Sequence, residues 1–154
     1  METIKLITYG LGNTLDVGRI KPIVNRDLKP YVGLWASPTQ SNYGWREYCL
    51  REDFGDLSTS FVFSVTGNIL KIDSKDDLEK IEWYCRWGCY FPNFELMQNE
   101  VDAIWLTITG LFETKNLLNK YALYGWDCES VLIMNKNVIN NGESGGLIEN
   151  NYDD

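Results

Sequence analysis

Short strand-like runs separated by turn residues dominate this chain of 154 residues, and they limit the folds that it can adopt. In the clearest run, residues 59–65, apolar and small polar side chains alternate as they do in a half-buried strand. The turn at 66–68 and the apolar run at 69–72 predict that the two runs form a hairpin. Further strands are predicted at residues 4–9, 34–37, 101–108 and 130–134. Because helices do not alternate regularly with these strands, the pattern predicts an α+β fold rather than a doubly wound parallel sheet.

Helix signals lie between these runs. Ser74 precedes two aspartates and an apolar spacing that continues to Cys85, which predicts the clearest helix of the chain. Ser41 is expected to cap a second helix, and residues 93–100 predict a third, short one. Residues 14–25 are compatible with a short helix or an irregular loop.

The length and composition predict a single globular domain over residues 1–140. From residue 141 onward the chain consists mainly of Asn, Gly, Glu, Ser and Asp. Such a segment has too little apolar surface to offset the entropy lost on ordering. Residues 141–154 are therefore expected to be a flexible acidic tail.

The absence of histidine and the negative net charge exclude or disfavour several functions. Histidine is absent, which excludes Ser-His-Asp and Cys-His catalysis and histidine-ligated metals. The 14 Lys and Arg against 22 Asp and Glu give a net charge of −8, which disfavours binding to nucleic acid and to anionic membranes. No long apolar run predicts a membrane helix, so we expect a cytoplasmic protein without membrane contact.

The four cysteines are few and irregularly spaced. Cys85 and Cys89 could begin a metal site only if Cys49 and Cys128 joined them from distant parts of the chain. We expect free thiols and no metal.

The segment before the last strand carries two carboxylates next to aromatic residues. Asp127 and Glu129 stand at i and i+2, so in an extended chain both would point to the same face. Carboxylates beside aromatic walls suit a ligand with a flat ring and ribose hydroxyls. Alternatively, Trp126 belongs to the core and the two acids are solvated charges at the entry to a strand.

Two other segments offer candidate binding residues. In residues 33–38 a short strand ends in small and hydroxyl residues, and Ser41, Tyr43 and Trp45 follow it. The first strand ends at Tyr9-Gly10, where glycine would let a ligand approach the backbone. Core packing and an ordinary turn are the alternative interpretations. The chain nevertheless holds six Trp and nine Tyr, and we expect some of them to line a pocket.

Taken in order, these segments resemble the ADP-ribosyltransferase superfamily, specifically small bacterial and phage-type members of the poly-ADP-ribose-polymerase-like branch. That family has His-Gly at the end of the first strand, a later Gly-x-Tyr-Phe-Ala strand before a helix with Ser and Tyr, and a glutamate at a late strand. This chain has Tyr9-Gly10, then Gly33-Leu34-Trp35-Ala36-Ser37 with Ser41-Asn42-Tyr43 after it, and Glu129. The resemblance covers residues 4–139 by order and pattern.

The resemblance implies a split, twisted, mixed or antiparallel sheet that holds NAD+ in a cleft without any metal. The backbone at Tyr9 and Gly10 would hold the nicotinamide amide or its ribose. Trp35 would stack on the nicotinamide ring, with Tyr43 on the opposite face.

The same resemblance assigns the polar roles. Ser37 or Ser41 would bond the carboxamide, and Asp127 would contribute to nucleotide binding. Glu129 would be the catalytic residue, since it would hold the ribose 2′-hydroxyl and stabilise the cationic transition state as nicotinamide leaves.

The chain departs from the family pattern at two positions, because Tyr9 replaces the family's histidine and Trp35 its tyrosine. Residues 58–60, Ser-Thr-Ser, also match the signature of the toxin-like branch, in which an acidic pair resembles Asp127-x-Glu129. That branch needs an arginine on the first strand, and this first strand has none.

The function expected from the resemblance is NAD+-dependent ADP-ribosylation of a protein, such as a phage-type effector acting on host machinery in the host cytoplasm. The alternative is a non-catalytic inhibitor on the same fold, which would bind a nucleotide or a host protein and antagonise host defence. A third possibility is an unrelated α+β module whose aromatic residues only form the core.

Overall fold

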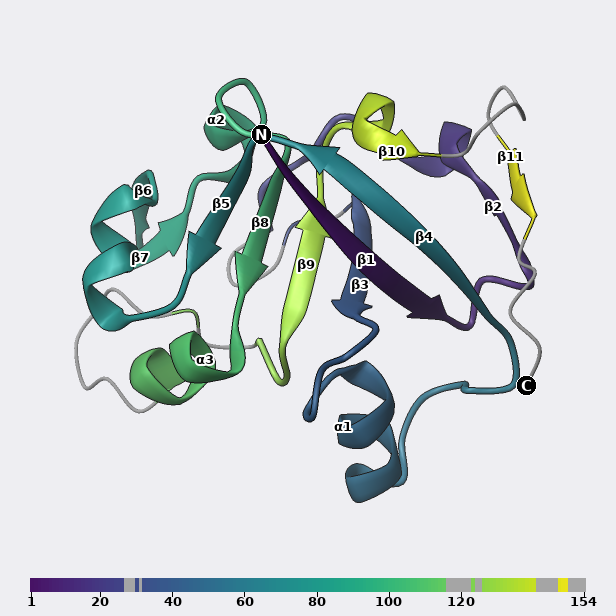
Figure 1. The fold of residues 1–154 in the computed structure, drawn as a ribbon. Coiled ribbons are helices and arrows are strands. Elements are labelled where there is room, and N and C mark those ends of the chain that lie inside the picture. Colours follow the sequence, from purple (N-terminus) through teal and green to yellow (C-terminus); the bar gives the residue numbers. More distant parts are fainter. Residues whose placement is uncertain (27–29, 31, 116–122, 124–125, 141–146, 150–154) are drawn as a thin grey trace.

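A computed structural model of the chain describes residues 1–26, 30, 32–115, 123, 126–140 and 147–149. Its main feature is an open, mixed sheet of seven strands in the order β10-β4-β1-β3-β9-β8-β5, which confirms the predicted α+β class (Figure 1). All neighbouring strands are antiparallel except β5 and β8. The strands are β1 (Glu2–Tyr9), β3 (Leu34–Pro38), β4 (Ser60–Gly67), β5 (Ile69–Ile72), β8 (Ala103–Leu106), β9 (Ser130–Ile133) and β10 (Ile139–Asn140).

Short helices and two small ribbons surround this sheet. The helices are α1 (Trp45–Glu52), α2 (Phe94–Met97) and α3 (Ile108–Lys115), with 3-10 turns η1 (Val17–Arg19), η2 (Lys75–Lys80) and η3 (Lys136–Val138). The ribbons pair β2 (Thr14–Asp16) with β11 (Leu147–Glu149), and β6 (Trp83–Arg86) with β7 (Cys89–Pro92). None of the helices in the described part of the chain is long and apolar enough to cross a membrane.

The predicted hairpin between β4 and β5 is wrong, although both strands exist. β4 pairs with β1 and β10, whereas β5 pairs with β8 at the opposite edge of the sheet. The twist of the sheet brings the end of β4 back to the start of β5 (Figure 1). Asn68 links the two strands there, and its backbone N–H donates to Asp102 Oδ2 at 2.8 Å.

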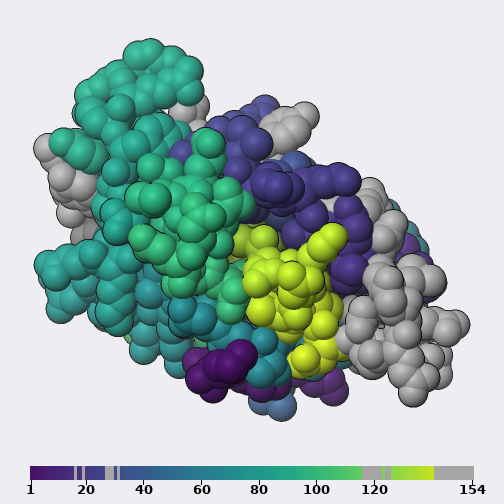
Figure 2. Space-filling model, turned by 90° about the horizontal axis from the view of Figure 1, so that it is seen from above, coloured from purple at the N-terminus to yellow at the C-terminus, as the bar shows by residue number. Residues whose placement is uncertain are grey.

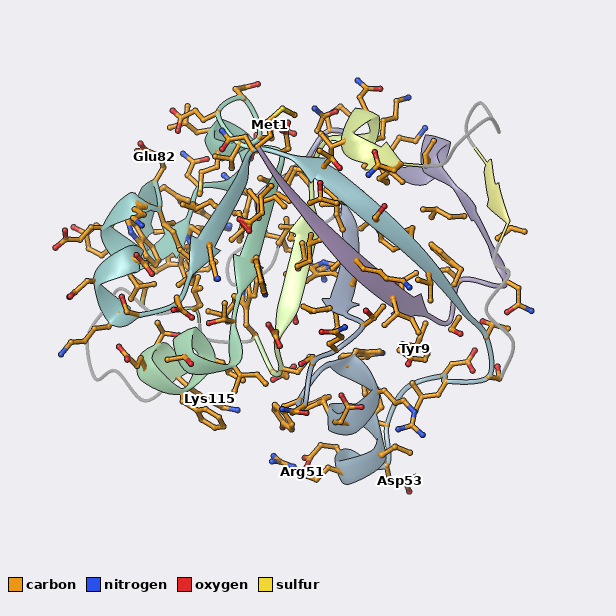
Figure 3. The ribbon with its side chains drawn as sticks, viewed as in Figure 1. Met1, Tyr9, Arg51, Asp53, Glu82 and Lys115 are labelled. Carbon is orange, nitrogen blue, oxygen red and sulfur yellow. The ribbon has the colours of Figure 1, made fainter. Side chains whose placement is uncertain are left out.

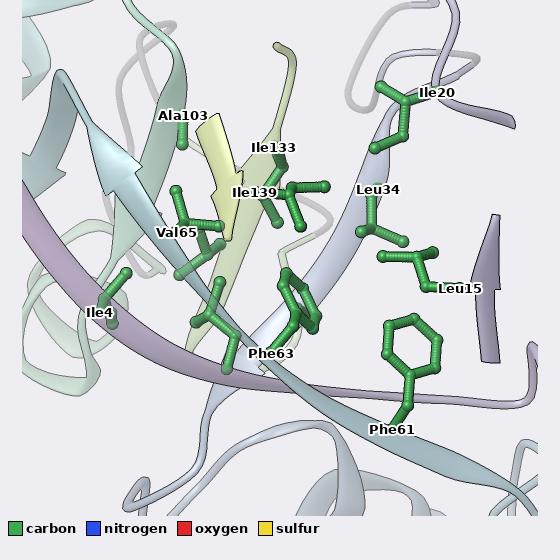
Figure 4. Close-up of a cluster of buried hydrophobic side chains, with 13 residues drawn as sticks. Ile4, Leu15, Ile20, Leu34, Phe61, Phe63, Val65, Ala103, Ile133 and Ile139 are labelled. Carbon is green, nitrogen blue, oxygen red and sulfur yellow. The ribbon is translucent and has the colours of Figure 1, made fainter. Parts of the chain in front are cut away.

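Alternate side chains of the central strands pack into two separate hydrophobic clusters. Val131 and Ile133 of β9 belong to a cluster that side chains of β1 and β4 cover, and we call this side of β9 the first face (Figure 4). Leu132 and Met134 belong to a second cluster with α2, α3 and Trp126, and this side is the second face. Because both faces are buried, β9 has four consecutive buried residues instead of an alternation.

The helix predicted after Ser74 is a 3-10 helix of six residues, η2. Ser74 forms a capping box with Asp77, but the chain turns extended at Ile81, and Cys85 lies in β6. Aromatic and β-forming residues on both sides of a turn favour the β6–β7 hairpin over a longer helix. The teal segment that contains this hairpin stands out from one corner of the molecule (Figure 2).

The other predicted elements have mixed outcomes. The short helix predicted at 93–100 is α2, whereas α1 is capped by Gly44 rather than Ser41, and α3 was not predicted. Residues 14–25 contain β2 and η1. Within the expected tail, Leu147–Glu149 pairs with β2 as β11; the other residues of 141–154 lie outside the described part.

The cysteines are free thiols, with Cys49 and Cys128 buried and Cys85 and Cys89 exposed. Cys85 is opposite Tyr90 across the hairpin, and Cys89 is opposite Arg86. Paired residues share a face and neighbours alternate, so Cys85 and Cys89 lie on opposite faces. Among the described residues, no three Cys, Asp or Glu side chains gather as a metal site would require.

Candidate functional site

The aromatic pocket is a cavity of about 440 Å³ where the ends of β1 and β3 meet α1 and the segment before β9. It is lined by Ile7, Thr8, Tyr9, Leu11, Gly33, Leu34, Trp35, Ala36, Ser37, Trp45, Asp127, Cys128 and Ser130. Four predicted site residues, Tyr9, Trp35, Ser37 and Asp127, are among them. Three stretches that are far apart in the sequence therefore meet at one cavity.

Ser37 holds these stretches together. Its hydroxyl donates to the Glu129 carbonyl oxygen and accepts from the Trp45 backbone N–H, each at 2.9 Å. The Thr8 hydroxyl donates to the Trp35 carbonyl oxygen at 2.8 Å. These bonds fix β1, β3, α1 and the start of β9 relative to one another. In Figure 3, Tyr9 lies at the end of β1, between that strand and α1.

Other rings support the aromatic walls of the pocket. Trp35 packs edge-to-face on the buried Trp126, with 4.8 Å between the ring centroids and 74° between the planes. Trp45 stacks on Tyr48, with centroids 5.6 Å apart. A ring held by its neighbours loses little freedom when a ligand stacks on it, which favours the binding of a flat group.

A second cavity of about 440 Å³, the basic pocket, shares a wall with the aromatic pocket. Ile7, Tyr9, Ser37 and Trp45 line both cavities, and the basic pocket adds Lys5, Arg46 and Glu47.

The basic pocket has two positive side chains, Lys5 and Arg46, and one negative side chain, Glu47. Glu47 Oε1 accepts from the Gly44 backbone N–H at 2.9 Å as part of the cap of α1, and Glu47 Oε2 lies 3.9 Å from Arg46. Lys5 and Arg46 leave one net positive charge in the cavity. A ligand that spans both pockets would place a flat group near Trp35 and an anionic group near Lys5 and Arg46.

The predicted catalytic residue, Glu129, does not line the aromatic pocket, although its neighbours Cys128 and Ser130 do. The chain bends at Cys128 and Glu129 before β9 begins, so the alternation of an extended strand does not apply to Asp127 and Glu129. Glu129 Oε2 instead accepts from Trp105 Nε1 at 2.8 Å. Glu129 and Trp105 both line another cavity, and neither belongs to the lining of the aromatic pocket.

Three other predicted residues also lie outside the lining of the aromatic pocket. Ser41 lines the basic pocket, and its hydroxyl accepts from the Tyr43 backbone N–H at 3.1 Å. Gly10 donates its N–H to the Thr59 carbonyl oxygen at 3.0 Å.

The Tyr43 side chain packs against the second-face cluster. Its hydroxyl is buried without a hydrogen-bond partner among the described residues. Burial raises the pKa of this phenol, Cys128, Glu52 and Asp127 raise it further, and Arg51 lowers it.

Sequence reasoning missed Lys5 and Arg46 as site residues. Lys5, Ile7 and Tyr9 alternate along β1 and all line the basic pocket, so the period of the strand could have linked Lys5 to Tyr9. Arg46 has no such signal, because its position depends on where α1 starts.

Comparison of the chain with protein-family models, with curated proteins and with solved structures found no match. The residues of the pockets therefore carry the functional argument.

Proposed function

We propose that this protein binds NAD+ or a related nucleotide across the aromatic and basic pockets. One observation carries the proposal: a cavity with aromatic walls and one carboxylate shares Tyr9, Ser37 and Trp45 with a cavity that carries excess positive charge. A nucleotide has the matching halves, a flat ring with ribose hydroxyls and a phosphate group.

Each half of the ligand has suitable contacts. A base or nicotinamide ring would stack against Trp35 or Trp45, and Asp127 would accept hydrogen bonds from ribose hydroxyls. The negative charge of Asp127 also favours the cationic nicotinamide ring. Lys5 and Arg46 would bind the phosphates, for which the planar guanidinium of arginine is well suited.

Isothermal titration calorimetry with NAD+, ADP-ribose and nicotinamide tests this proposal. We expect Trp35→Ala and Arg46→Ala each to weaken ADP-ribose binding by about tenfold or more, because each removes one half of the site. Arg86→Ala, on the distant hairpin, is the matched control and should bind like the natural chain. Absence of saturable binding of all three ligands would refute the proposal.

Transfer of ADP-ribose to a protein is a second candidate function, and the position of Asp127 in the aromatic pocket favours it. In this reaction the bond between ribose and nicotinamide breaks, nicotinamide leaves, and a nucleophile of the target protein bonds to the ribose. Asp127 would take the role that the sequence assigned to Glu129, because it is the only carboxylate among the described residues that line this pocket.

Incubation with labelled NAD+ and a cell lysate separates transfer from binding alone. If transfer occurs, a labelled protein band should form, Asp127→Asn should abolish it and Glu129→Gln should preserve it. Nucleotide binding without a labelled band or released nicotinamide would favour the non-catalytic inhibitor. Loss of the band with Glu129→Gln alone would restore the role first predicted for Glu129.

The ADP-ribosyltransferase-like assignment of the fold remains part of this proposal. Its support is that Tyr9 and Trp35, the counterparts of two family positions, lie in one pocket of a mixed sheet. The position of Glu129 outside that pocket argues against a direct transfer of the family's catalytic glutamate to this chain.

A further inference from the structure

Of the charged residues whose burial the structure describes, Glu129 alone is buried, with 6% of its surface exposed. Its backbone is firmly held, because its N–H donates to the Tyr43 carbonyl oxygen and its carbonyl oxygen accepts from Ser37, each at 2.9 Å. Its carboxylate has one hydrogen bond among the described residues, from Trp105 Nε1. The fold therefore fixes this carboxylate in place and provides a single neutral donor for it.

A buried carboxylate normally needs a cation or several donors, because removal of its charge from water is unfavourable. No lysine or arginine of the described residues forms an ion pair with Glu129. The Nζ of Lys71 lies 4.6 Å from the centre of the Trp105 ring. Lys71 thus contacts the ring that donates to Glu129, and the carboxylate itself has no cationic partner.

Glu129 lines a cavity of about 400 Å³, which we call the Glu129 pocket. The pocket lies where the N-terminal half of β1 faces the chain that leaves β3, and Trp105, Thr39 and Ser41 also line it. Glu129 Oε1 has no partner among the described residues, yet it is not a fully buried unpaired atom. This oxygen is therefore accessible, and the cavity that Glu129 lines is where a ligand could reach it.

We propose that the Glu129 pocket binds the protonated amine or guanidine group of a small ligand. The cation would bond to Glu129 Oε1, and the hydroxyls of Thr39 and Ser41 would accept its remaining N–H groups. One carboxylate with neutral oxygen neighbours suits an ammonium ion better than a divalent metal, which takes several charged ligands. The proposal does not depend on the nucleotide proposed above, although Lys5, Thr39 and Ser41 also line the basic pocket.

Lys5 should lower the affinity of the Glu129 pocket for amines. It lines both this pocket and the basic pocket. Its ammonium group repels a cationic ligand at the mouth of the Glu129 pocket. Its side chain is exposed and flexible, so it can turn toward the basic pocket. Removal of this charge should therefore strengthen the binding of amines.

The experiment titrates agmatine and cadaverine into the ¹⁵N-labelled full chain and follows the indole N–H signals by NMR. We expect a saturable shift of the Trp105 signal, whereas 1-pentanol, which has an alkyl chain without the charge, should cause none. Glu129→Gln should weaken amine binding about tenfold or more. Glu79→Gln, an exposed glutamate on η2, is the matched control and should change nothing.

Lys5→Ala keeps the test decisive if Glu129→Gln does not fold. In that variant the affinity for both amines should rise severalfold, and unchanged or weaker binding would overturn the proposal. The proposal also fails if neither amine causes a saturable shift, or if Glu129→Gln folds and binds amines like the natural chain. Calorimetry with ADP-ribose on the same variants reports separately on the nucleotide proposal.

Discussion

Asp127 and Glu129 are two residues apart, yet they belong to different pockets and have different surroundings. Asp127 is half-buried at the aromatic pocket, whereas Glu129 is buried and bonded to Trp105. The bend at Cys128 and Glu129 separates them before the strand starts. The comparison shows that two carboxylates at i and i+2 belong to different sites when the chain bends at that point.

The two carboxylates should therefore differ in what they contribute to folding and to binding. A half-exposed acid keeps much of its hydration, so its removal affects mainly the ligand that it contacts. A buried acid depends on its donor for stability. Substitutions at the two pockets can test this difference.

The largest effect is expected for Trp105→Phe. Loss of the indole N–H leaves the buried Glu129 carboxylate without its one donor, which should lower the free energy of unfolding by about 2 kcal/mol. Asp127→Asn, in contrast, should lower it by a smaller amount, because Asp127 is only half-buried. Urea unfolding of the three proteins measures both values, and equal losses would contradict the comparison.

A double-mutant cycle separates the hydrogen bond from the packing of the Trp105 ring. Glu129→Gln keeps an acceptor for the indole but removes the buried charge. If the charge is the reason for the loss, Trp105→Phe should cost clearly less in the Glu129→Gln background. An unchanged cost would assign the effect to packing alone.

A smaller loss of stability is expected for Gly44→Ala, which changes the aromatic and basic pockets and leaves the Glu129 carboxylate in place. A Cβ at Gly44 would lie 2.9 Å from Ser37 Cβ, so α1 would have to move away from β3. We expect a loss of about 1–2 kcal/mol in the free energy of unfolding, because atoms are added to a close contact. Calorimetry should show weaker ADP-ribose binding, since the movement displaces Trp45 from the shared wall.

Asn42→Ala is the control for this change, because Asn42 is exposed and only two residues away. It should leave both the unfolding free energy and ADP-ribose binding unchanged within about 0.5 kcal/mol. If Gly44→Ala behaves like Asn42→Ala, the contact between α1 and β3 is not what shapes the aromatic pocket.

The sequence predicts where the strands are better than it predicts which strands pair. The alternation in residues 59–65 depends only on local burial, and β4 occupies that stretch. The partner of β5 is β8, more than thirty residues further along the chain, and no local signal specifies that pairing. The turn at Asn68 suggested a hairpin, but the twist of the sheet decides where each strand goes.

The candidate site shows the same limit. Tyr9, Trp35, Ser37 and Asp127 were predicted from the residue types at strand ends, and all four line the aromatic pocket. The sequence predicted that the Glu129 side chain would point to the same side as Asp127, which is wrong. The chain bends at Cys128 and Glu129, and residue types do not reveal such a bend. Pockets depend on how distant elements meet, which is why residue types predict candidates more reliably than they predict geometry.

The smallest effect has the opposite sign and concerns Tyr43. The Tyr43 carbonyl oxygen accepts a hydrogen bond from the Glu129 backbone N–H. The Tyr43 hydroxyl is buried without a partner among the described residues, so Tyr43→Phe should raise the free energy of unfolding at neutral pH by about 0.5–1 kcal/mol.

This effect should depend on pH. Burial raises the pKa of the Tyr43 phenol above its usual value near 10, so the unfolded chain releases the proton first as the pH rises. The stability that depends on the protonated phenol is complete below pH 10 and is lost as the pH rises through the folded-state pKa. Tyr43→Phe removes this loss, and its advantage should grow above pH 10 in urea unfolding. A loss of stability at neutral pH would instead show that the hydroxyl has a partner in solution.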